Sequence, residues 1–377
     1  MRSINPVPLA PVASRPRGAV KLNDTLITGW VGWEAESNSY YSADTFRVTF
    51  IVDRLPPDRD KRWFSAQADM LVELFGGYPD DPERYSLTDL TSELYGRVDD
   101  IDFDIVAGTI ELVGRDLTSV FIDAKTTEKW PNLTASQIAT QLARRHGLTP
   151  VVTATSNKVG KYYEIDHVNL TDQRSEWDVL TYLAHIEGFV VYVSGRELHF
   201  GPKTDPESTP YLIQWSPPDD SRGYPEANAV DLKFTRALTV SRGIQVVVRT
   251  WNAKQKKGFT VSYPSKAKTT QAGKAKPFGG AQIFSYTIPG LTQEQALQRA
   301  QKIYDELIAH EMKLVARMPA DPLLRVTTMI EVAGTDTDWD QRYFPDSVVR
   351  RMSMNMSDGY VMSVNAKNHA PDSTVTL

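Results

Sequence analysis

Residues 110–200 carry one pattern of hydrophobic and polar positions twice. In each copy, a polar residue precedes apolar positions that recur every three to four residues, as in a helix with one buried face. Thr134 with Gln137 has the spacing of a capping box, in which two side chains satisfy backbone N–H groups reciprocally. Ser175 with Asp178 is a weaker form of the same signal. The pattern predicts one helix after Thr134 and another after Ser175.

A glycine and then an extended run follow each predicted helix. Gly147 and Gly188 stand where a helix needs a left-handed residue to end. The runs that come next, 148–155 and 189–200, are rich in β-branched and aromatic residues, which is typical of strands. Residues 114–205 are therefore expected to form a compact α/β domain.

The preceding segment, residues 20–113, reads as a small β domain. Its clearest stretch is 45–53, where apolar and polar positions alternate as in a half-buried strand. The apolar face of that strand is expected to hold Phe46, Val48, Phe50 and Val52. Further strands are expected at 20–33 around a turn at Asn23-Asp24, at 69–75 and at 94–113.

Beyond the α/β domain, residues 206–227 are rich in Pro, Gly, Ser and Asp and are expected to be a linker. Residues 228–377 then predict a second β domain. Its strands are expected within 228–250, at 281–288, and at about 324–333, 347–354 and 359–366. Residues 252–280 are rich in Lys and Gly with few apolar anchors, so a mobile loop is expected there.

The longest predicted helix covers residues 292–318 in this second β domain. Thr292 and Gln295 again have capping-box spacing, and Pro319 lies just past the end. The apolar residues that fall near helical period are Ala296, Ala300, Ile303, Leu307, Leu314 and Met318. One long helix is therefore expected to pack on the second β domain.

Composition narrows the class of protein. The chain has 377 residues, 41% of them hydrophobic and 24% charged, which is ordinary for a soluble protein of two or three domains. It has no cysteine, so disulfides, thiolate metal sites and cysteine nucleophiles are excluded. No stretch approaches the roughly 18 apolar residues of a membrane helix, so no stable membrane insertion is expected. Residues 1–19 hold four prolines and no signal-peptide core; we expect an extended arm, disordered or laid along a neighbouring subunit.

The net charge of −5 is unevenly distributed. Residues 34–111 are strongly acidic, whereas residues 232–293 contain no Asp or Glu. The cations of the second stretch are Lys233, Arg236, Arg242, Arg249, Lys254, Lys256, Lys257, Lys266, Lys268, Lys274 and Lys276. Such polarity can orient subunits against one another or line a passage.

No motif for a cofactor, a nucleophile elbow or a phosphate loop is present, and none of the histidines has zinc-ligand spacing. The six histidines are His146, His167, His185, His199, His310 and His369; His146 and His310 are expected near helix C-termini, in dipole or capping roles. No catalytic, cofactor or metal-binding residue is assigned.

The acidic run 99–104 is the densest candidate for chemistry. In a strand, Asp100, Asp102 and Asp104 share one face, so a surface strand is expected, and whether the run binds an ion stays open. Glu34 with Glu36, and Glu93 with Asp99, offer the carboxylate pairs of a glycosidase.

The basic residues 232–280 offer another kind of site. Their lysines interleave with Trp251, Phe259 and Tyr263, a mixture that can stack on single-stranded nucleic acid. A solvated or partner-facing loop explains the same composition, and the rest of the chain is acidic. A nucleic-acid-binding module therefore stands as an alternative hypothesis.

The motifs of residues 114–148 resemble the late control D family of phage tail proteins, which are the baseplate hubs of Mu-like and related contractile-tailed phages. The matching motifs are Gly114-Arg115-Asp116 after a strand and Trp130-Pro131-Asn132-Leu133-Thr134 before a helix. A helix followed by Gly188-Phe189 and a hairpin ending in Leu198-His199-Phe200 also matches. The predicted helix at 292–318 and a closing hairpin over 342–369 complete the likeness, with Met352 where the family commonly has a non-catalytic His.

This resemblance implies an α+β, mainly β fold with two similar tube-type β-barrel domains and an inserted α/β domain. It implies a homotrimer that forms a pseudo-sixfold ring and joins the tail tube to the central spike. The family is also similar in fold to the T-even hub and to the N-terminal part of type VI secretion spike proteins.

The expected partners are the spike protein, tail tube or tube-initiator proteins, other baseplate proteins and the tape measure protein, with DNA only in transit. The expected location is the virion tail baseplate, after assembly in the host cytoplasm. A structural protein without enzymatic activity is therefore the leading hypothesis. A tail-associated cell-wall hydrolase and the nucleic-acid-binding module are the alternatives.

Overall fold

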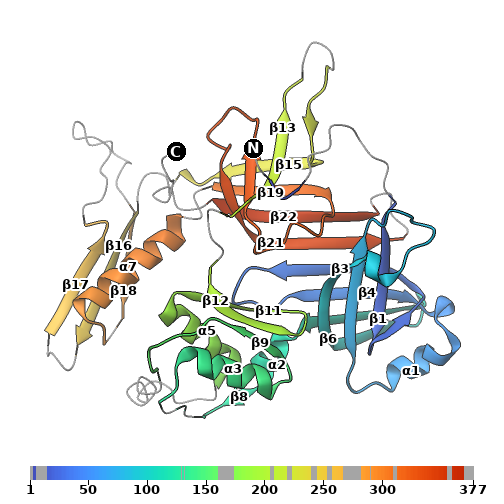
Figure 1. Ribbon diagram of the computed structural model, residues 1–377, viewed down its shortest axis with the longest axis horizontal. Helices are drawn as coiled ribbons and strands as arrows, with labels where there is room; N and C mark the ends of the chain where they lie inside the picture. The colour runs from blue at the N-terminus through green and yellow to red at the C-terminus, as the bar shows by residue number, and fades with distance from the viewer. Residues whose placement is uncertain are drawn as a thin grey trace. The chain divides into compact units, whose positions relative to one another are not determined.

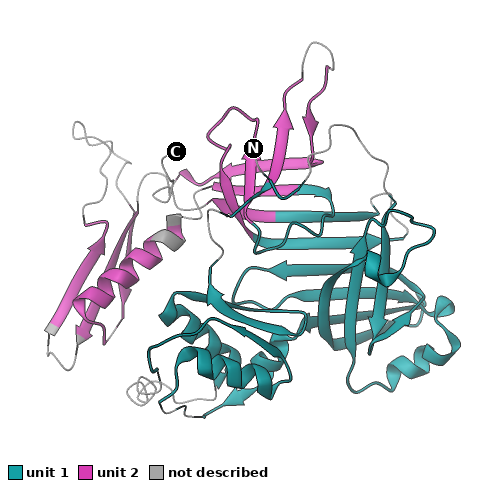
Figure 2. Cartoon of the chain, in the orientation of Figure 1, with its two compact units in different colours: residues 1–211, 317–328, 346–364 teal, residues 212–316, 329–345, 365–377 magenta. Residues whose placement is uncertain are grey.

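The computed structural model describes residues 3–5, 15–128, 130, 132–159, 174–203, 208–218, 223–238, 244–252, 257–265, 282–288, 290–308, 312–354 and 359–368. Strands predominate in this part of the chain (Figure 1), which confirms the expected α+β, mainly β class. The chain divides into two compact units (Figure 2). Unit 1 comprises residues 1–211, 317–328 and 346–364, and unit 2 comprises residues 212–316, 329–345 and 365–377. None of the described helices is long and apolar enough to cross a membrane.

Unit 1 contains a large antiparallel sheet with the strand order β21–β3–β4–β7–β6–β5–β1–β2. The strands are β1 (Arg17–Leu22), β2 (Thr25–Ile27), β3 (Trp30–Asn38), β4 (Thr45–Ile51), β5 (Leu71–Gly77), β6 (Thr91–Asp104), β7 (Thr109–Asp116) and β21 (Arg342–Ser353). The connections hold α1 (Lys61–Ser65) and short 3-10 turns at Val52–Arg54, Pro57–Arg59 and Leu87–Asp89. Most neighbours in sequence are neighbours in the sheet, so hairpins build this part of the fold.

One face of this sheet is buried, and strand β4 shows why. Phe46, Val48 and Phe50 alternate into the core, which confirms the face predicted for residues 45–53. Val52 does not continue the strand, because the backbone turns there into a 3-10 turn and leaves Val52 only partly buried. Phe64 of α1 completes the core by packing on Phe50, with ring centroids 5.5 Å apart.

Two turns define hairpins in this sheet. Asn23 and Asp24 both have positive φ, 48° and 63°, as a two-residue hairpin turn of type I′ requires, which confirms the turn predicted at this place. The strand expected at 94–113 is instead two strands, β6 and β7, joined by a turn at residues 105–108.

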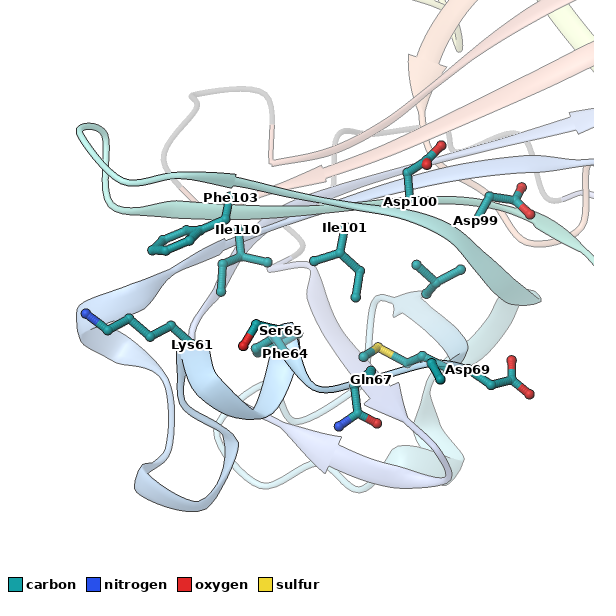
Figure 3. A pocket seen from close by; sticks show the side chains of 13 residues that line it. Lys61, Phe64, Ser65, Gln67, Asp69, Asp99, Asp100, Ile101, Phe103 and Ile110 are labelled. Carbon is teal, nitrogen blue, oxygen red and sulfur yellow. The ribbon is translucent and has the colours of Figure 1, made fainter.

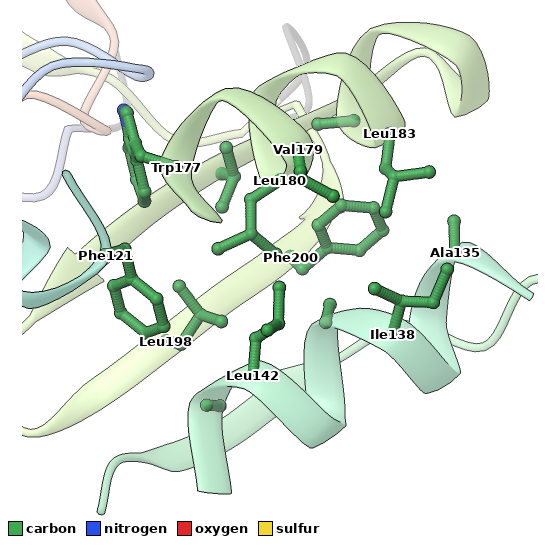
Figure 4. Close-up of a cluster of buried hydrophobic side chains, with 14 of the residues drawn as sticks. Phe121, Ala135, Ile138, Leu142, Trp177, Val179, Leu180, Leu183, Leu198 and Phe200 are labelled. Carbon is green, nitrogen blue, oxygen red and sulfur yellow. The ribbon is translucent and has the colours of Figure 1, made fainter. Parts of the chain in front are cut away.

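Residues 118–202 of unit 1 form a smaller α/β layer. Its elements are α2 (Thr118–Asp123), β8 (Lys125–Thr126), α3 (Ala135–Arg145), β9 (Thr149–Val152), β10 (Arg174–Ser175), α5 (Glu176–Glu187), β11 (Phe189–Ser194) and β12 (Glu197–Pro202). Helices α3 and α5 face the sheet β11–β12–β9 across a core that includes Ile138, Leu142, Leu180 and Phe200 (Figure 4).

The caps predicted for these helices are present. Thr134 and Gln137 form a complete capping box at α3, and Ser175 and Asp178 form one at α5. Gly147 and Gly188 have φ of 74° and 69° at the two C-termini. Local side-chain chemistry therefore fixes both helices at the predicted places.

In unit 2, helix α7 (Gln293–Ile308) packs on the sheet β17–β16–β18. The strands are β16 (Ile244–Asn252), β17 (Lys257–Tyr263) and β18 (Gln282–Thr287). Strand β17 lies within the expected mobile loop 252–280, so that part of the segment is a strand; residues 253–256 and 266–280 lie outside the described residues. Thr292 and Gln295 form the predicted capping interaction, with bonds of 2.9 and 3.3 Å.

Two predictions for the rest of this part of the chain are wrong. The segment 206–227, expected to be a linker, contains strand β13 (Tyr211–Ser216) and the short β14 (Glu226–Ala227), which pair with each other. The helix expected to reach residue 318 ends at Ile308, and β19 (Met312–Pro319) follows. Met312, Leu314, Ala316 and Met318 are buried at every second position, which is the period of a strand. The remaining strands of unit 2 are β15 (Asp231–Arg236) and β20 (Ile330–Ala333); β22 (Tyr360–Asn368) begins in unit 1 and ends in unit 2.

Candidate interaction surface

The motif Gly114-Arg115-Asp116 joins the large sheet of unit 1 to the α/β layer. Gly114 lies so close to β6 that a Cβ would stand 2.1 Å from the Arg97 carbonyl oxygen, so no side chain fits. The Arg115 guanidinium pairs with the carboxylate of Asp99 at 2.7 Å, and this pairing raises the pKa of Arg115. The motif is therefore a structural joint between two strands.

Asp116 continues that joint into the α/β layer. Its carboxylate accepts hydrogen bonds from the Thr118 hydroxyl (2.8 Å), the Thr118 N–H (3.2 Å) and the Asp44 N–H (3.2 Å). The Asp44 carboxylate in turn accepts from the Asn38 N–H at 2.7 Å. Burial raises the pKa of Asp44 to about 7, and burial together with the charge of Asp44 raises that of Asp116 well above its usual value.

Asp44 and Asp116 line a hollow of about 320 Å³ within unit 1. Tyr192 and His199 line it from the α/β layer, with their rings stacked 4.6 Å apart, and burial lowers the pKa of His199. Glu93 lines it as well.

Glu93 is paired from two sides. Its carboxylate lies 3.1 Å from the Arg350 guanidinium and accepts a 2.6 Å hydrogen bond from the Tyr360 hydroxyl. Arg350 is buried and donates to the carbonyl oxygens of Asp321 and Leu324. The carboxylates around the hollow therefore hold strands and loops together.

Glu93 and Asp99, one of the carboxylate pairs proposed for a hydrolase, line different cavities, whereas Glu34 and Glu36 of the other pair lie two residues apart on the same face of β3. Glu93 lines the hollow just described, whereas Asp99 lines a different groove and pairs with Arg115. Glu34 lies on the outer face of β3 and pairs with Arg351 of β21. These positions give the hydrolase hypothesis no support.

The outer face of the β6–β7 hairpin is acidic. A bulge after Val98 displaces Asp99, and beyond it Asp100 lies opposite Val113 and Asp102 opposite Glu111. Asp100 and Asp102 are exposed, and no ion pair joins them to any described residue. Glu111 is paired with Arg47 of β4 at 3.3 Å, so Asp100 and Asp102 are the carboxylates of this face that remain for a cationic partner. Among the described residues, no group of three or more acidic or histidine side chains could hold a metal ion.

The turn of this hairpin presents apolar side chains to solvent. Ile105 is 77% exposed and Val106 is 99% exposed. The Asp104 carboxylate accepts hydrogen bonds from the N–H groups of Val106 (2.9 Å) and Ala107 (2.8 Å), and Gly108 supplies the left-handed residue. The turn is therefore held in one conformation with its apolar side chains outward.

A groove of about 360 Å³ lies between α1 and the same hairpin (Figure 3). Phe64, Ile101 and Ile110 point into it, while the carboxylates of Asp99 and Asp100 point away (Figure 3). Ile101 and Asp100 therefore point to opposite faces, as the alternation predicts, whereas Asp99 departs from it because of the bulge after Val98.

The aromatic residues of the basic stretch lie on different faces of their sheet. In β17, Phe259 pairs with buried Thr250 of β16, and Tyr263 packs on Tyr304 of α7. Trp251 lies on the opposite face. These three rings, which are described by the structure, therefore do not share the single face on which successive bases would stack.

The histidines that the structure describes have structural partners. His146 caps α3 and its ring lies 2.6 Å from the buried carboxylate of Glu176, while His185 contacts the Thr181 carbonyl oxygen. The C-terminal position of His146 is as predicted; His167, His310 and His369 lie outside the described residues. Sequence reasoning placed Ile105 on the apolar face of an extended strand and did not single out Val106, because 94–113 reads as extended; Ala107-Gly108 is the signal of the turn.

No known protein-family model matches the sequence, and no curated protein matches it. The chain is, however, similar to solved structures. A tail protein from Neisseria meningitidis has a TM-score of 0.65 and 14% identity, covering 94% of this chain and 97% of its own. The 43 kDa tail protein of prophage MuSo2 from Shewanella oneidensis has a TM-score of 0.62 and 13% identity, covering 93% of this chain and 98% of its own.

An E. coli component of the type VI secretion system, described as similar to the T4 tail proteins gp27 and gp5, has a TM-score of 0.50 and 9% identity over 93% of this chain and 77% of its own. At such identities the likeness concerns the fold. The protein therefore has the fold of phage tail proteins, and that fold extends to a type VI secretion component, as the sequence motifs imply.

Proposed function

We propose that this protein is the structural baseplate hub of a contractile phage tail. In this role three copies form a closed ring of pseudo-sixfold symmetry, built from two tube-type β-barrel domains per copy. The observation that carries the proposal is the likeness to solved tail proteins over nearly the full length of both chains, the inserted α/β layer included. A likeness of such extent favours the same type of particle and not merely a shared domain.

The ring joins the tail tube to the central spike, and it contacts tube-initiator, tape measure and other baseplate proteins. It is assembled in the host cytoplasm, is located in the virion, and meets DNA only in transit. No catalytic step is assigned to it, because the buried carboxylates of unit 1 hold structural elements together. Glu93, for example, is paired with Arg350 and Tyr360.

Mass measurement tests this function. Native mass spectrometry of the full chain is expected to show a species of three times the 42.3 kDa chain mass, and negative-stain images are expected to show rings. Dilution series give the dissociation constant of the trimer. A protein that stays monomeric at high concentration and forms no rings would contradict the proposal.

A further inference from the structure

Helix α7 covers one face of the sheet β17–β16–β18 of unit 2, and no described helix or strand covers the other, which is called the uncovered face below. Ile244, Val246 and Val248 of β16 point toward α7 and are buried. The alternate residues of β16 therefore point away from the helix, and Arg249 and Trp251 among them are exposed. The neighbours on this uncovered face are Thr260 and Ser262 of β17 and Ile283, Ser285 and Thr287 of β18.

This uncovered face combines apolar and cationic groups. Trp251 is 58% exposed and lies two residues from Arg249 on this face, whereas Ile283, 62% exposed, lies beside Gln245 at the other end of β16. Trp251 lies over Gly258, where an added Cβ would stand 3.3 Å from the indole ring. Arg249 is exposed and forms no ion pair with any described residue. Because residues 232–293 contain no Asp or Glu, the segment that supplies this face holds no carboxylate to neutralise it.

The side chains of this face favour a protein over a nucleic acid as its occupant. Stacking of successive bases needs several aromatic rings on one face. Only Trp251 points there among the aromatic residues described in β16 and β17, since Phe259 and Tyr263 point to the helix side. An exposed Trp beside an Arg is, by contrast, a frequent centre of protein interfaces.

The β6–β7 hairpin of unit 1 has the complementary properties. Its turn exposes Ile105 and Val106 in a fixed conformation, so little ordering entropy is lost when they bind. Its outer face carries Asp100 and Asp102 without cationic partners among the described residues. Apolar groups flanked by carboxylates thus match apolar groups flanked by an arginine.

We propose that the β6–β7 hairpin of one copy docks on the uncovered face of the sheet β17–β16–β18 of a second copy. This inference rests on the proposed function and identifies one contact of its ring. Each copy supplies one hairpin and one face, so the contact is heterologous and closes when a few copies complete a circle. Ile105, Val106 and Trp251 anchor a larger interface, because a stable one buries about 1,200–2,000 Å² in total.

Cross-linking tests the contact directly, because the chain has no cysteine of its own. One preparation carries Val106→Cys and a second, with a mass tag, carries Ser285→Cys; a short bismaleimide joins thiols that lie close together. The mixture is expected to give a mixed dimer at least about tenfold more abundantly than a control mixture in which Val151→Cys replaces Ser285→Cys. Val151 is 43% exposed on β9, so it offers an accessible thiol outside both surfaces.

A chain that carries both Val106→Cys and Ser285→Cys is expected to give a ladder of cross-linked products that stops at three copies. A ladder that continues past three would mean that the contact builds filaments and would overturn the closed ring.

Charge reversal gives an independent measurement. Arg249→Glu and Asp102→Lys are each expected to weaken the trimer by about tenfold, as followed by sedimentation velocity. Combining the two in one chain restores opposite charges, so the double variant is expected to recover most of the lost affinity. Both side chains are exposed, so circular dichroism and the melting temperature are expected to stay unchanged in every variant.

The outcomes separate this inference from the proposed function. If the unmodified chain forms trimers while cross-linking stays at the control level and both reversals leave the trimer intact, the contact is wrong and the hub function stands. If the unmodified chain is a monomer, both fail. Tight retention of single-stranded DNA that is lost on Arg249→Glu would instead make the face a nucleic-acid site and overturn the docking.

Discussion

Two layers of this protein share a plan, with helices on one face of a three-stranded sheet, and differ on the other face. In unit 1, α3 and α5 cover β11–β12–β9; in unit 2, α7 covers β17–β16–β18. The second face of the first sheet meets the rest of unit 1: Tyr192 packs on Tyr40 at 5.6 Å, and Arg196 contacts the Tyr95 hydroxyl. The second face of the other sheet exposes Trp251.

This difference shows which contacts stabilise each layer and which role each layer has. The first layer buries both faces of its sheet within one unit, so its contacts act in folding and in positioning. The second layer leaves exposed, on the face turned away from α7, Trp251 and Arg249 two residues apart on one strand, a pairing that is frequent at the centre of protein interfaces. The same architecture therefore serves as an internal support in one place and as a candidate contact in the other.

Core substitutions are expected to give the largest effect and to separate the two layers. Leu180→Ala removes a fully buried side chain from the larger core and is expected to cost about 3–4 kcal/mol of unfolding free energy, measured by urea denaturation. Val248→Ala in the smaller core is expected to cost about 1–2 kcal/mol. Ile186→Ala, at a 46% exposed position of α5, serves as the control. Equal losses at Leu180 and Ile186 would contradict the comparison.

Tyr41 is expected to give the next largest effect, because it joins the first layer to the β3–β4 connection. Its hydroxyl donates to the Phe189 carbonyl oxygen at 2.7 Å and its ring stacks on His185 at 4.4 Å. Tyr41→Ala is expected to cost about 2–3 kcal/mol and to increase hydrogen exchange in β11. Tyr41→Phe keeps the stacking and is expected to cost about 1 kcal/mol. Unchanged protection of β11 in Tyr41→Ala would show that the docking lies elsewhere.

Local structure could be predicted where short-range chemistry decides it. The caps at Thr134 and Ser175, and the glycines that end the helices, act within four residues and are present as predicted. The end of α7 could not be read in this way, because Leu314 and Met318 fit a helical period and a strand period equally well. Burial of Met312 and Ala316 decides between them, and burial depends on tertiary packing.

The candidate surfaces were harder to predict, because they depend on residues far apart in sequence. The acidic face of 99–104 follows from alternation alone, and the structure has it as predicted. The approach of Asp44 to Asp116 joins residues 72 positions apart. No local pattern encodes such a pairing, and none shows which face of β16 is left uncovered.

Asp44 is expected to give the smallest effect. Its titration measures the electrostatic free energy that is lost when the second face of the sheet β11–β12–β9 is covered. The pKa of Asp44 is raised to about 7 by burial, and Glu36, Arg350 and Asp116 are the charged groups around it. A raised carboxyl pKa means that the native state holds more protons than the unfolded chain between about pH 4 and pH 7. Stability from this group is therefore present at low pH and lost as the pH rises through about 7.

Asp44→Asn removes this loss and keeps an oxygen that can accept from the Asn38 N–H. The full shift corresponds to about 4 kcal/mol, but relaxation and water entry around the ionised carboxylate reduce it, so the variant is expected to match the parent at pH 4 and to exceed its unfolding free energy at pH 8 by roughly 1–2 kcal/mol, in urea titrations across that range. Asp100→Asn, at an exposed position of β6, is the matched control and is expected to leave the pH dependence nearly as in the parent. Parallel curves for Asp44→Asn and the parent would mean that Asp44 is solvated in the native protein and that the first sheet covers its second face without electrostatic cost.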